Sequence, residues 1–371
     1  MRIKKVTLYR LEIPMMCGKF SCSLEPGVEQ AEVVITRVET ECGLVGYGES
    51  GSVGGYPNYS PGILASSAEL ISRHLMGKDP RHVNAIQHSM SLIDGHGAIK
   101  SGFDMACWDI LGKSVNKPLH EMLGGKLMDR VPLYRSIPTE APEDMVQSVK
   151  DWRAEGYRMF QLRVGHGDIQ ADLQRIAGVI SKRRNDELYT VDVAGHWRVD
   201  EALYILNAVR DLDFTIEQPC WTVDDCMSLR QRITFPMKLD NSLNSVHDVM
   251  RAYANNACDS IVIHLNKFGG ISPSRIARDL ASAGGLGLTY STQWGTEITT
   301  AALIHLGMTT QPDRLISTID SHNYSSLTVA TNAPIIVDNG EMWLNDDAPG
   351  LGVVVDDNAL GEPAHVIEHG A

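Results

Sequence analysis

Eight short apolar segments, each but the last followed by a stretch with helical periodicity, limit the folds open to this chain. Such alternation of strand and helix predicts βαβ units with right-handed crossovers and a parallel sheet. No glycine-rich GxGxxG turn follows any segment, which argues against an open dinucleotide-binding sheet. The candidate strands are residues 131–137, 159–164, 189–193, 214–217, 237–240, 260–265, 286–291 and 315–320.

Polar residues recur at the ends of these segments with a regular spacing. Arg163, Asp192, Glu217, Asp240 and His264 follow one another at intervals of 23 to 29 residues. Each interval accommodates one strand, one helix and two loops, so eight such units favour a (β/α)8 barrel. In a barrel the carboxyl ends of the strands meet at one face, where such barrels carry their chemistry. We therefore expect these five side chains to lie at one rim.

Charge and cysteine content exclude several classes of partner. The chain has 33 Lys and Arg against 46 Asp and Glu, a net charge of −13, so we expect no nucleic-acid partner. The longest weakly polar run, residues 298–308, is too short to cross a bilayer, so we expect no membrane association. Seven cysteines with no CxxC pair indicate a reduced, cytoplasmic protein.

Three of the rim residues are carboxylates. If Asp192, Glu217 and Asp240 lie within several ångströms, each raises the pKa of its neighbours, and a divalent cation removes that cost. Three hard oxygen donors suit Mg²⁺, or Mn²⁺ as a substitute, whereas the absence of Cys and His makes zinc a poorer fit. The alternative is that each carboxylate caps a helix or pairs with Arg or Lys.

Several motifs resemble those of the enolase superfamily, in its muconate-lactonizing and mandelate-racemase-like branch. They are the G-x-GE turn at 46–49, the D-M-A-x-W-D-x-x-G-K helix at 104–113, the I-E-Q-P segment at 216–219 and the K-x-G-G segment at 267–270. The resemblance covers nearly the whole chain. It implies a modified (β/α)8 TIM barrel with an α+β capping domain, and it places Asp192, Glu217 and Asp240 at the positions of the family's metal ligands.

The resemblance also implies a domain plan. We expect residues 1–126 to form the capping domain, residues 127–332 the barrel, and residues 333–371 a C-terminal segment that completes the cap. Loops of the cap would close over the barrel and select the substrate. Two loops fit this role, one with Lys19 and one with Tyr56. A homo-oligomer is also expected from the family.

The family's chemistry is removal of the proton α to a carboxylate, with Mg²⁺ stabilising the enediolate. Its second barrel strand usually ends K-x-K, but here it reads Gln161-Leu162-Arg163. Gln161 resembles members that act on hydroxyprolines and proline betaines, and we expect it to contact substrate. Arg163 stays protonated, so we expect an electrostatic clamp rather than a base. His264 occupies the position of the sixth-strand Lys and is the candidate base.

The presence of a single candidate base, His264, distinguishes between racemisation and β-elimination. Racemisation needs a proton-transfer group on each face of the α-carbon, whereas β-elimination needs only one. We therefore expect a dehydratase or related lyase acting on a small carboxylic acid, such as a hydroxyproline-like or betaine-like acid. A racemase, epimerase or cycloisomerase is the alternative within the superfamily. If the protein is not an efficient enzyme, the alternative is a catalytically weak barrel that binds metal and ligand.

Other polar or aromatic residues follow the barrel strands. His196 is a candidate acid for a leaving hydroxyl, or an ordinary surface histidine. Gln293, Trp294 and Asp320 are candidate substrate contacts, and the Trp294 indole could face a substituted ammonium group. The alternatives are a core role for Trp294 and a turn contact between Asp320 and His322.

Overall fold

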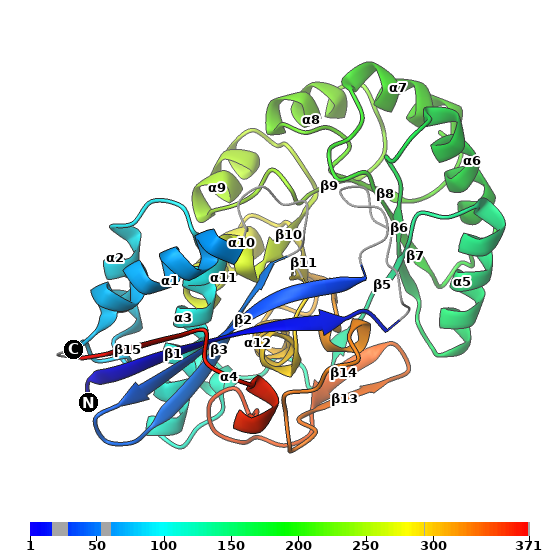
Figure 1. The fold of residues 1–371 in the computed structure, drawn as a ribbon. Helices are drawn as coiled ribbons and strands as arrows, with labels where there is room; N and C mark the ends of the chain where they lie inside the picture. The colour runs from blue at the N-terminus through cyan, green and yellow to red at the C-terminus, as the bar shows by residue number, and fades with distance from the viewer. Residues whose placement is uncertain (17–28, 53–60, 293, 370–371) are drawn as a thin grey trace.

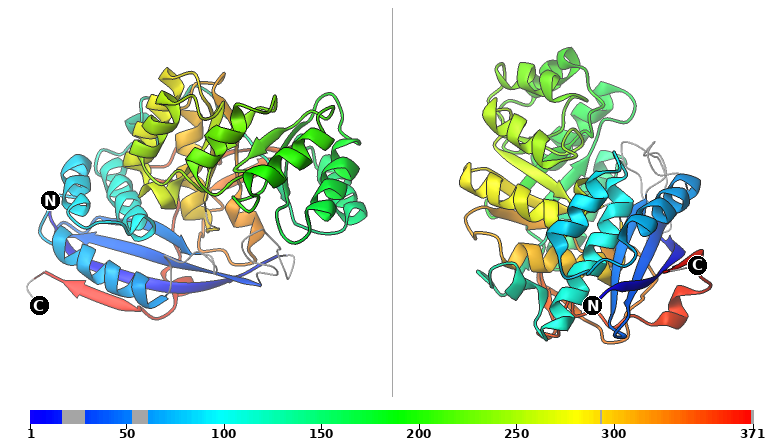
Figure 2. Two further views of the ribbon diagram at one scale, coloured as in Figure 1. Left: turned by 90° about the horizontal axis from the view of Figure 1, so that it is seen from above. Right: turned by 90° about the vertical axis from the view of Figure 1, so that its left-hand side faces the viewer.

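The computed structural model describes residues 1–16, 29–52, 61–292 and 294–369. Its larger part is a ring of parallel strands with helices outside, and its smaller part is an antiparallel sheet with helices on one face (Figure 1). The two views in Figure 2 show the antiparallel sheet along one side of the molecule, with both chain termini near the same end of it.

Eight parallel strands form one continuous sheet in the order β12-β11-β10-β9-β8-β7-β6-β5. A parallel bridge between Leu133 and Thr318, and a 3.2 Å hydrogen bond from the Tyr134 amide to the Thr318 carbonyl, bring its two edges together. The sheet therefore curls toward a closed barrel, as expected. The strands are β5 (Arg135–Ile137), β6 (Met159–Arg163), β7 (Leu188–Asp192), β8 (Thr215–Glu217), β9 (Met237–Leu239), β10 (Ser260–His264), β11 (Gly287–Ser291) and β12 (Leu315–Thr318).

The first predicted strand, residues 131–137, is divided. Its beginning, β4 (Val131–Pro132), pairs antiparallel with β14 (Glu341–Leu344), which pairs with β13 (Ile335–Asp338). Pro132 has no N–H to donate to a parallel ladder, which explains why the barrel strand starts later. The other seven segments are confirmed within one or two residues.

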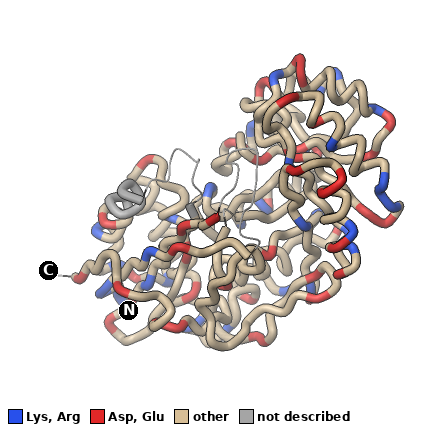
Figure 3. Tube along the Cα trace, turned by 45° about the vertical axis from the view of Figure 1, so that its right-hand side comes forward, with Lys and Arg blue, Asp and Glu red and all other residues tan. Residues whose placement is uncertain are grey.

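Helices cover the outside of the barrel (Figure 1). Several begin at side-chain caps that the sequence provides: Asp168, Thr222 and Ser245 accept backbone N–H groups of α6, α8 and α9. Acidic and basic residues intermingle along the barrel helices (Figure 3). The helices are α5 (Pro142–Ala154), α6 (Ile169–Ile180), α7 (Val199–Ala208), α8 (Val223–Arg230), α9 (Val246–Ala254), α10 (Leu265–Phe268), α11 (Ile271–Ala283) and α12 (Glu297–Met308).

The smaller part is a four-stranded antiparallel sheet, ordered β15-β1-β2-β3, with helices packed on it. Gly48 lets β3 approach α3 closely, since a Cβ there would lie 1.9 Å from the Gly102 carbonyl oxygen. The C-terminal strand β15 lies beside β1, while the domain boundaries at 126 and 332 stay predictions. The elements are β1 (Ile3–Pro14), β2 (Gln30–Thr40), β3 (Val45–Ser52), β15 (His365–Glu368), α1 (Pro61–Leu75), α2 (Val83–Ser91), α3 (Gly97–Ser114) and α4 (Leu119–Met122).

The end of β1 is fastened to the barrel. Met15 forms an antiparallel bridge with Ser325, and the Met16 amide donates to the Tyr324 carbonyl at 2.9 Å. Tyr324 ends the 3-10 helix η1 (Ser321–Tyr324), which follows β12; a second such turn, η2 (Asp357–Leu360), lies near the C-terminus. Within the described residues, no helix has the length and apolar character needed to cross a membrane.

Candidate active site

The predicted rim residues lie at the same ends of neighbouring barrel strands. Arg163, Asp192, Glu217 and His264 are the last residues of β6, β7, β8 and β10, and Asp240 directly follows β9. Arg163 is the register partner of Asp192, and Asp192 is the partner of Glu217. The expected juxtaposition is therefore present, whereas the catalytic and ligand roles of these residues stay predictions.

Asp192 and Glu217 share one hydrogen-bond donor. The Gln161 amide nitrogen lies 3.0 Å from Asp192 Oδ2 and 3.1 Å from Glu217 Oε1. Burial raises the pKa of Asp192, and burial together with the charge of Asp192 raises the pKa of Glu217 to about 7. Two buried carboxylates thus stand close enough to oppose each other's ionisation.

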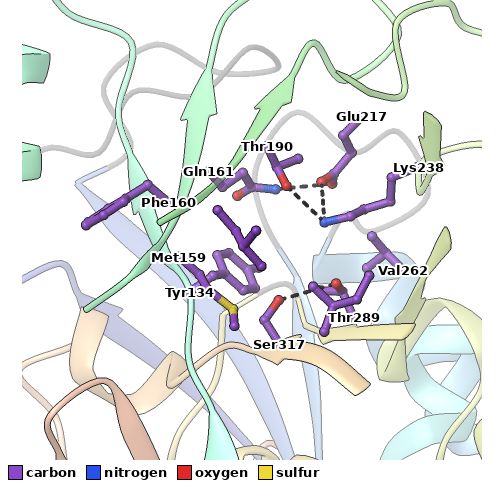
Figure 4. A pocket seen from close by; sticks show the side chains of 12 residues that line it. Tyr134, Met159, Phe160, Gln161, Thr190, Glu217, Lys238, Val262, Thr289 and Ser317 are labelled. Carbon is purple, nitrogen blue, oxygen red and sulfur yellow. Dashed lines mark hydrogen bonds and ion pairs between the residues drawn. The ribbon is translucent and has the colours of Figure 1, made fainter. Parts of the chain in front are cut away.

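Each of the three carboxylates also pairs with its own cation. Arg163 Nη1 lies 2.5 Å from Asp192 Oδ2, and Lys267 Nζ lies 2.7 Å from Asp240 Oδ1. Lys238 Nζ lies 3.4 Å from Glu217 Oε2 (Figure 4). Burial opposes ionisation of Asp240, but the charge and hydrogen bond of Lys267, together with the other positive groups nearby, hold the pKa of Asp240 below its ordinary value.

These ion pairs bear directly on the predicted metal site. In the part of the chain that the structure describes, no three His, Cys, Asp or Glu side chains converge closely enough to hold a metal ion. Each carboxylate makes the ion pair that the alternative from the sequence describes, and the metal site stays a prediction. The donor set still fits a hard cation: three oxygen ligands from adjoining strands, with Glu217 Oε2 buried and without a hydrogen-bond partner among the described residues. Metal binding would require these ion pairs to open.

His264 is the predicted base, and its imidazole can accept a proton when it is neutral. Its side chain is buried, and Nδ1 has no hydrogen-bond partner within the described residues. Burial lowers the pKa of His264 to about 3, against the opposing pull of Asp240. The imidazole is therefore neutral at physiological pH, which is the form that can act as a base.

Arg163 has the geometry of an electrostatic group rather than a base. Besides its ion pair with Asp192, its Nε donates to Ser136 Oγ at 3.2 Å. The side chain is 22% exposed, so the guanidinium lies at the rim rather than beneath it. A fixed positive charge at the end of β6, across the barrel rim from His264, can attract a carboxylate but cannot take its α-proton.

The remaining predicted residues fall into three groups. His196 is exposed on the loop after β7, with Nδ1 3.1 Å from the Val193 carbonyl. The Trp294 ring is partly buried, with its centroid 5.3 Å from that of Tyr324. Predicted substrate contacts that lie outside the described residues are Lys19, Tyr56 and Gln293.

Asp320 is held by several protein groups, and its role as a substrate contact stays a prediction. Its carboxylate is fully buried and accepts hydrogen bonds from Arg135 at 3.3 Å, the Tyr157 hydroxyl at 3.1 Å and Asn323 at 2.9 Å. These contacts explain its burial without a substrate, and they differ from the predicted turn contact with His322.

Sequence reasoning missed Lys238 and the role of Gln218. Lys238 lies two residues before Asp240, so both face the same side of β9; a lysine inside a predicted barrel strand was the available signal. The Gln218 side-chain oxygen accepts from the Asp240 amide at 2.9 Å and from the Ser242 amide at 3.2 Å. Gln218 thereby couples the end of β8 to the end of β9.

Comparison with known proteins gives the same picture over the whole chain. Residues 10–124 match the mandelate racemase / muconate lactonizing enzyme N-terminal domain, and residues 144–359 match the enolase C-terminal domain-like family. The chain is 37% identical over 366 residues to cis-3-hydroxy-L-proline dehydratase from Roseibium aggregatum, covering 98% of this chain and 99% of that one. It is 26% identical to N-succinyl-L-Arg/Lys racemase from Bacillus cereus, covering 98% of each.

Solved structures of this family also match the fold over nearly the whole chain. A mandelate racemase/muconate lactonizing enzyme from Roseovarius nubinhibens ISM superposes with a TM-score of 0.94 at 33% identity, covering 99% of each chain. An enolase superfamily member from the same organism, crystallised with magnesium, gives a TM-score of 0.93 at 30% identity, covering 99% of this chain and all of the other.

Proposed function

This chain belongs to the enolase superfamily, in the mandelate racemase and muconate lactonizing enzyme branch, and on that premise we propose that it is a lyase that dehydrates a small hydroxylated carboxylic acid. The observation that carries the proposal is the composition of the rim. It offers one neutral imidazole, His264, and a permanently protonated guanidinium, Arg163, where two-base members need a second proton acceptor.

His264 takes the proton α to the substrate carboxylate. The electrons of that C–H bond form the new C=C bond as the β-carbon loses its hydroxyl, and the imidazolium returns the proton to the departing hydroxide as water. Arg163 binds the substrate carboxylate and stabilises the negative charge that develops on its oxygens. A Mg²⁺ ion bound by Asp192, Glu217 and Asp240 would supply further stabilisation of that charge. Mn²⁺ could replace it.

The substrate class follows from one relative and one residue. The relative that is 37% identical over nearly the full length dehydrates cis-3-hydroxy-L-proline. Gln161 presents a buried side-chain oxygen that has no hydrogen-bond donor among the described residues and suits an N–H group. We therefore infer a hydroxyproline-like acid, with Gln161 and the Trp294 ring as contacts. The homo-oligomeric state and cytoplasmic location expected from the sequence stay predictions.

The test is incubation with hydroxyproline isomers and Mg²⁺ in D₂O, followed by NMR and mass spectrometry. Loss of water from one isomer supports the proposal, and inversion without loss of water would establish the racemase or epimerase alternative. His264→Asn is expected to lose about 10²- to 10⁴-fold in rate while keeping Mg²⁺ binding. Mg²⁺ binding with neither dehydration nor deuterium exchange for any isomer would identify a non-catalytic barrel.

A further inference from the structure

Lys238 is a lysine enclosed within the barrel, beneath the rim. It lies on β9, is the register partner of Glu217 on β8, and has a side chain only 5% exposed. It lines a small internal cavity together with Gln161 and Thr190 (Figure 4). Barrel interiors are ordinarily filled by branched apolar side chains, so a buried cation in this layer calls for a specific partner.

The partner is the least satisfied of the three carboxylates. Lys238 Nζ lies 3.4 Å from Glu217 Oε2 and donates to Thr190 Oγ1 at 3.2 Å. Glu217 Oε2 has no hydrogen bond within the described residues, and its polar contact there is this ion pair. Removal of either charge would leave the other buried without compensation.

Lys238 and Arg163 differ in the space available to their charged groups. The Arg163 side chain is 22% exposed at the rim. Arg163 therefore has solvent into which it can turn if a metal ion approaches Asp192. Lys267 is as buried as Lys238, with 6% of its side chain exposed, and it donates to both the backbone carbonyl and the carboxylate of Asp240. Strands enclose Lys238, so its charge stays beside whatever Glu217 binds.

We propose that Lys238 is a fixed counter-ion of Glu217. It stabilises the carboxylate trio when no metal is present, and it weakens the affinity of the trio for a divalent cation. Lys238 is thus a positioning residue, since it acts through Glu217 and not on substrate. The inference rests on the proposed function only in that the trio takes up a divalent cation.

The experiment measures Mg²⁺ affinity by calorimetry and melting temperature with and without Mg²⁺. Lys238→Gln and Lys238→Met are expected to bind Mg²⁺ at least about tenfold more tightly than the wild type, because a nearby positive charge is gone. Without metal, both variants should have a lower melting temperature than the wild type. Addition of Mg²⁺ should raise their melting temperatures by more than it raises that of the wild type. Lys238→Arg, which keeps the charge, should bind Mg²⁺ like the wild type. Lys126→Met removes a cation from an exposed pair with Asp347 and controls for net charge.

The outcomes separate this inference from the proposed function. Equal or weaker Mg²⁺ binding by Lys238→Gln than by the wild type overturns the inference, as does equally tight binding by Lys238→Arg and Lys238→Gln. Tighter binding by Lys238→Gln, in a protein that dehydrates no acid, supports the inference and refutes the proposed function. Absence of Mg²⁺ binding by every variant overturns both. If Lys238→Met does not fold, Lys238→Gln still carries the test, because an amide can bond Thr190.

Discussion

In the proposed mechanism, Arg163 restricts the site to a reaction that needs one base. Its guanidinium lies 2.5 Å from Asp192 and cannot lose a proton at physiological pH. Arg163→Lys keeps the positive charge but places an amine, which can release a proton where a guanidinium cannot, across the barrel rim from the candidate base. We predict that this variant exchanges the α-proton with solvent and inverts the α-carbon of a substrate that the wild type only dehydrates.

The measurement is chiral chromatography of substrate recovered from D₂O after partial turnover. Arg163→Met, which offers neither charge nor base, is the matched control and should bind the acid more weakly without inverting it. Inversion by the wild type at a rate comparable to that of Arg163→Lys would contradict the assignment of Arg163 as a clamp.

The candidate site shows what residue types at strand ends can and cannot reveal. The periodicity predicted that Asp192, Glu217 and Asp240 would end adjoining strands, because parallel strands start and stop together in a barrel. It did not predict their partners. Lys238 and Lys267 reach their carboxylates through side-chain conformations fixed by packing, which sequence spacing does not encode.

Among the secondary-structure elements, α12 is held at its beginning by a residue from the other part of the molecule. Residues 46–49, the predicted G-x-GE turn, instead lie within strand β3, and Glu49 accepts from the backbone N–H groups of Thr296 at 2.8 Å and Thr299 at 3.0 Å. The hydroxyl of Thr299 also donates to it at 2.6 Å. A carboxylate at a helix N-terminus is stabilised by the orphan amides and the helix dipole. Glu49 therefore joins the cap sheet to the barrel and fixes the start of α12, just after Trp294.

We predict that Glu49→Ala lowers the free energy of unfolding by about 3–5 kcal/mol, because it leaves several buried donors without an acceptor. Glu49→Gln keeps an acceptor oxygen, so its free energy of unfolding should fall by less than that of Glu49→Ala. Urea denaturation measures both. Thr222→Ala removes an exposed N-cap from α8 and gives the scale of an ordinary cap, about 1 kcal/mol. A loss for Glu49→Ala no larger than that of Thr222→Ala would contradict the linking role.

Residues 298–308 are the longest weakly polar run of the sequence, and the sequence alone does not explain why this helix is apolar on all sides. Every residue of α12 is buried, unlike those of α6 or α9, which each show one buried face. The outer face of α12 is covered by β3, α4 and β14, which come from distant parts of the chain. Periodicity locates a helix and its inner face, but it cannot report a second layer that only the tertiary fold supplies.

At the scale of the whole molecule, a buried histidine pair connects α4, α12 and the C-terminal segment. His305 Nδ1 accepts from the His120 amide at 3.1 Å, and its Nε2 lies 3.3 Å from the Leu351 carbonyl. Burial lowers the pKa of His305 to about 3, and burial also lowers the pKa of His120. Both rings are therefore neutral in the folded protein at physiological pH, where they join three segments far apart in sequence.

This pair makes stability depend on pH with a defined sign. The folded-state pKa of His305 is below the ordinary value of 6.5, so the unfolded chain binds more protons as the pH falls. The stabilisation is complete above pH 6.5 and is lost progressively as the pH falls from 6.5 toward 3. For His305 alone, the loss between pH 7 and pH 5 is about 2 kcal/mol.

His305→Gln removes the titrating ring while keeping a donor and an acceptor, so we predict a flatter pH dependence in this variant. Urea denaturation at pH 7 and pH 5 measures it: the difference between the two free energies of unfolding should be smaller than in the wild type by about 2 kcal/mol. Asp104, whose pKa burial raises to about 6, acts in the opposite direction, because its contribution grows as the pH falls below 6. Since both proteins retain Asp104, its effect cancels in the comparison. Equal pH dependence in the two proteins would show that His305 does not set the acid stability of this junction.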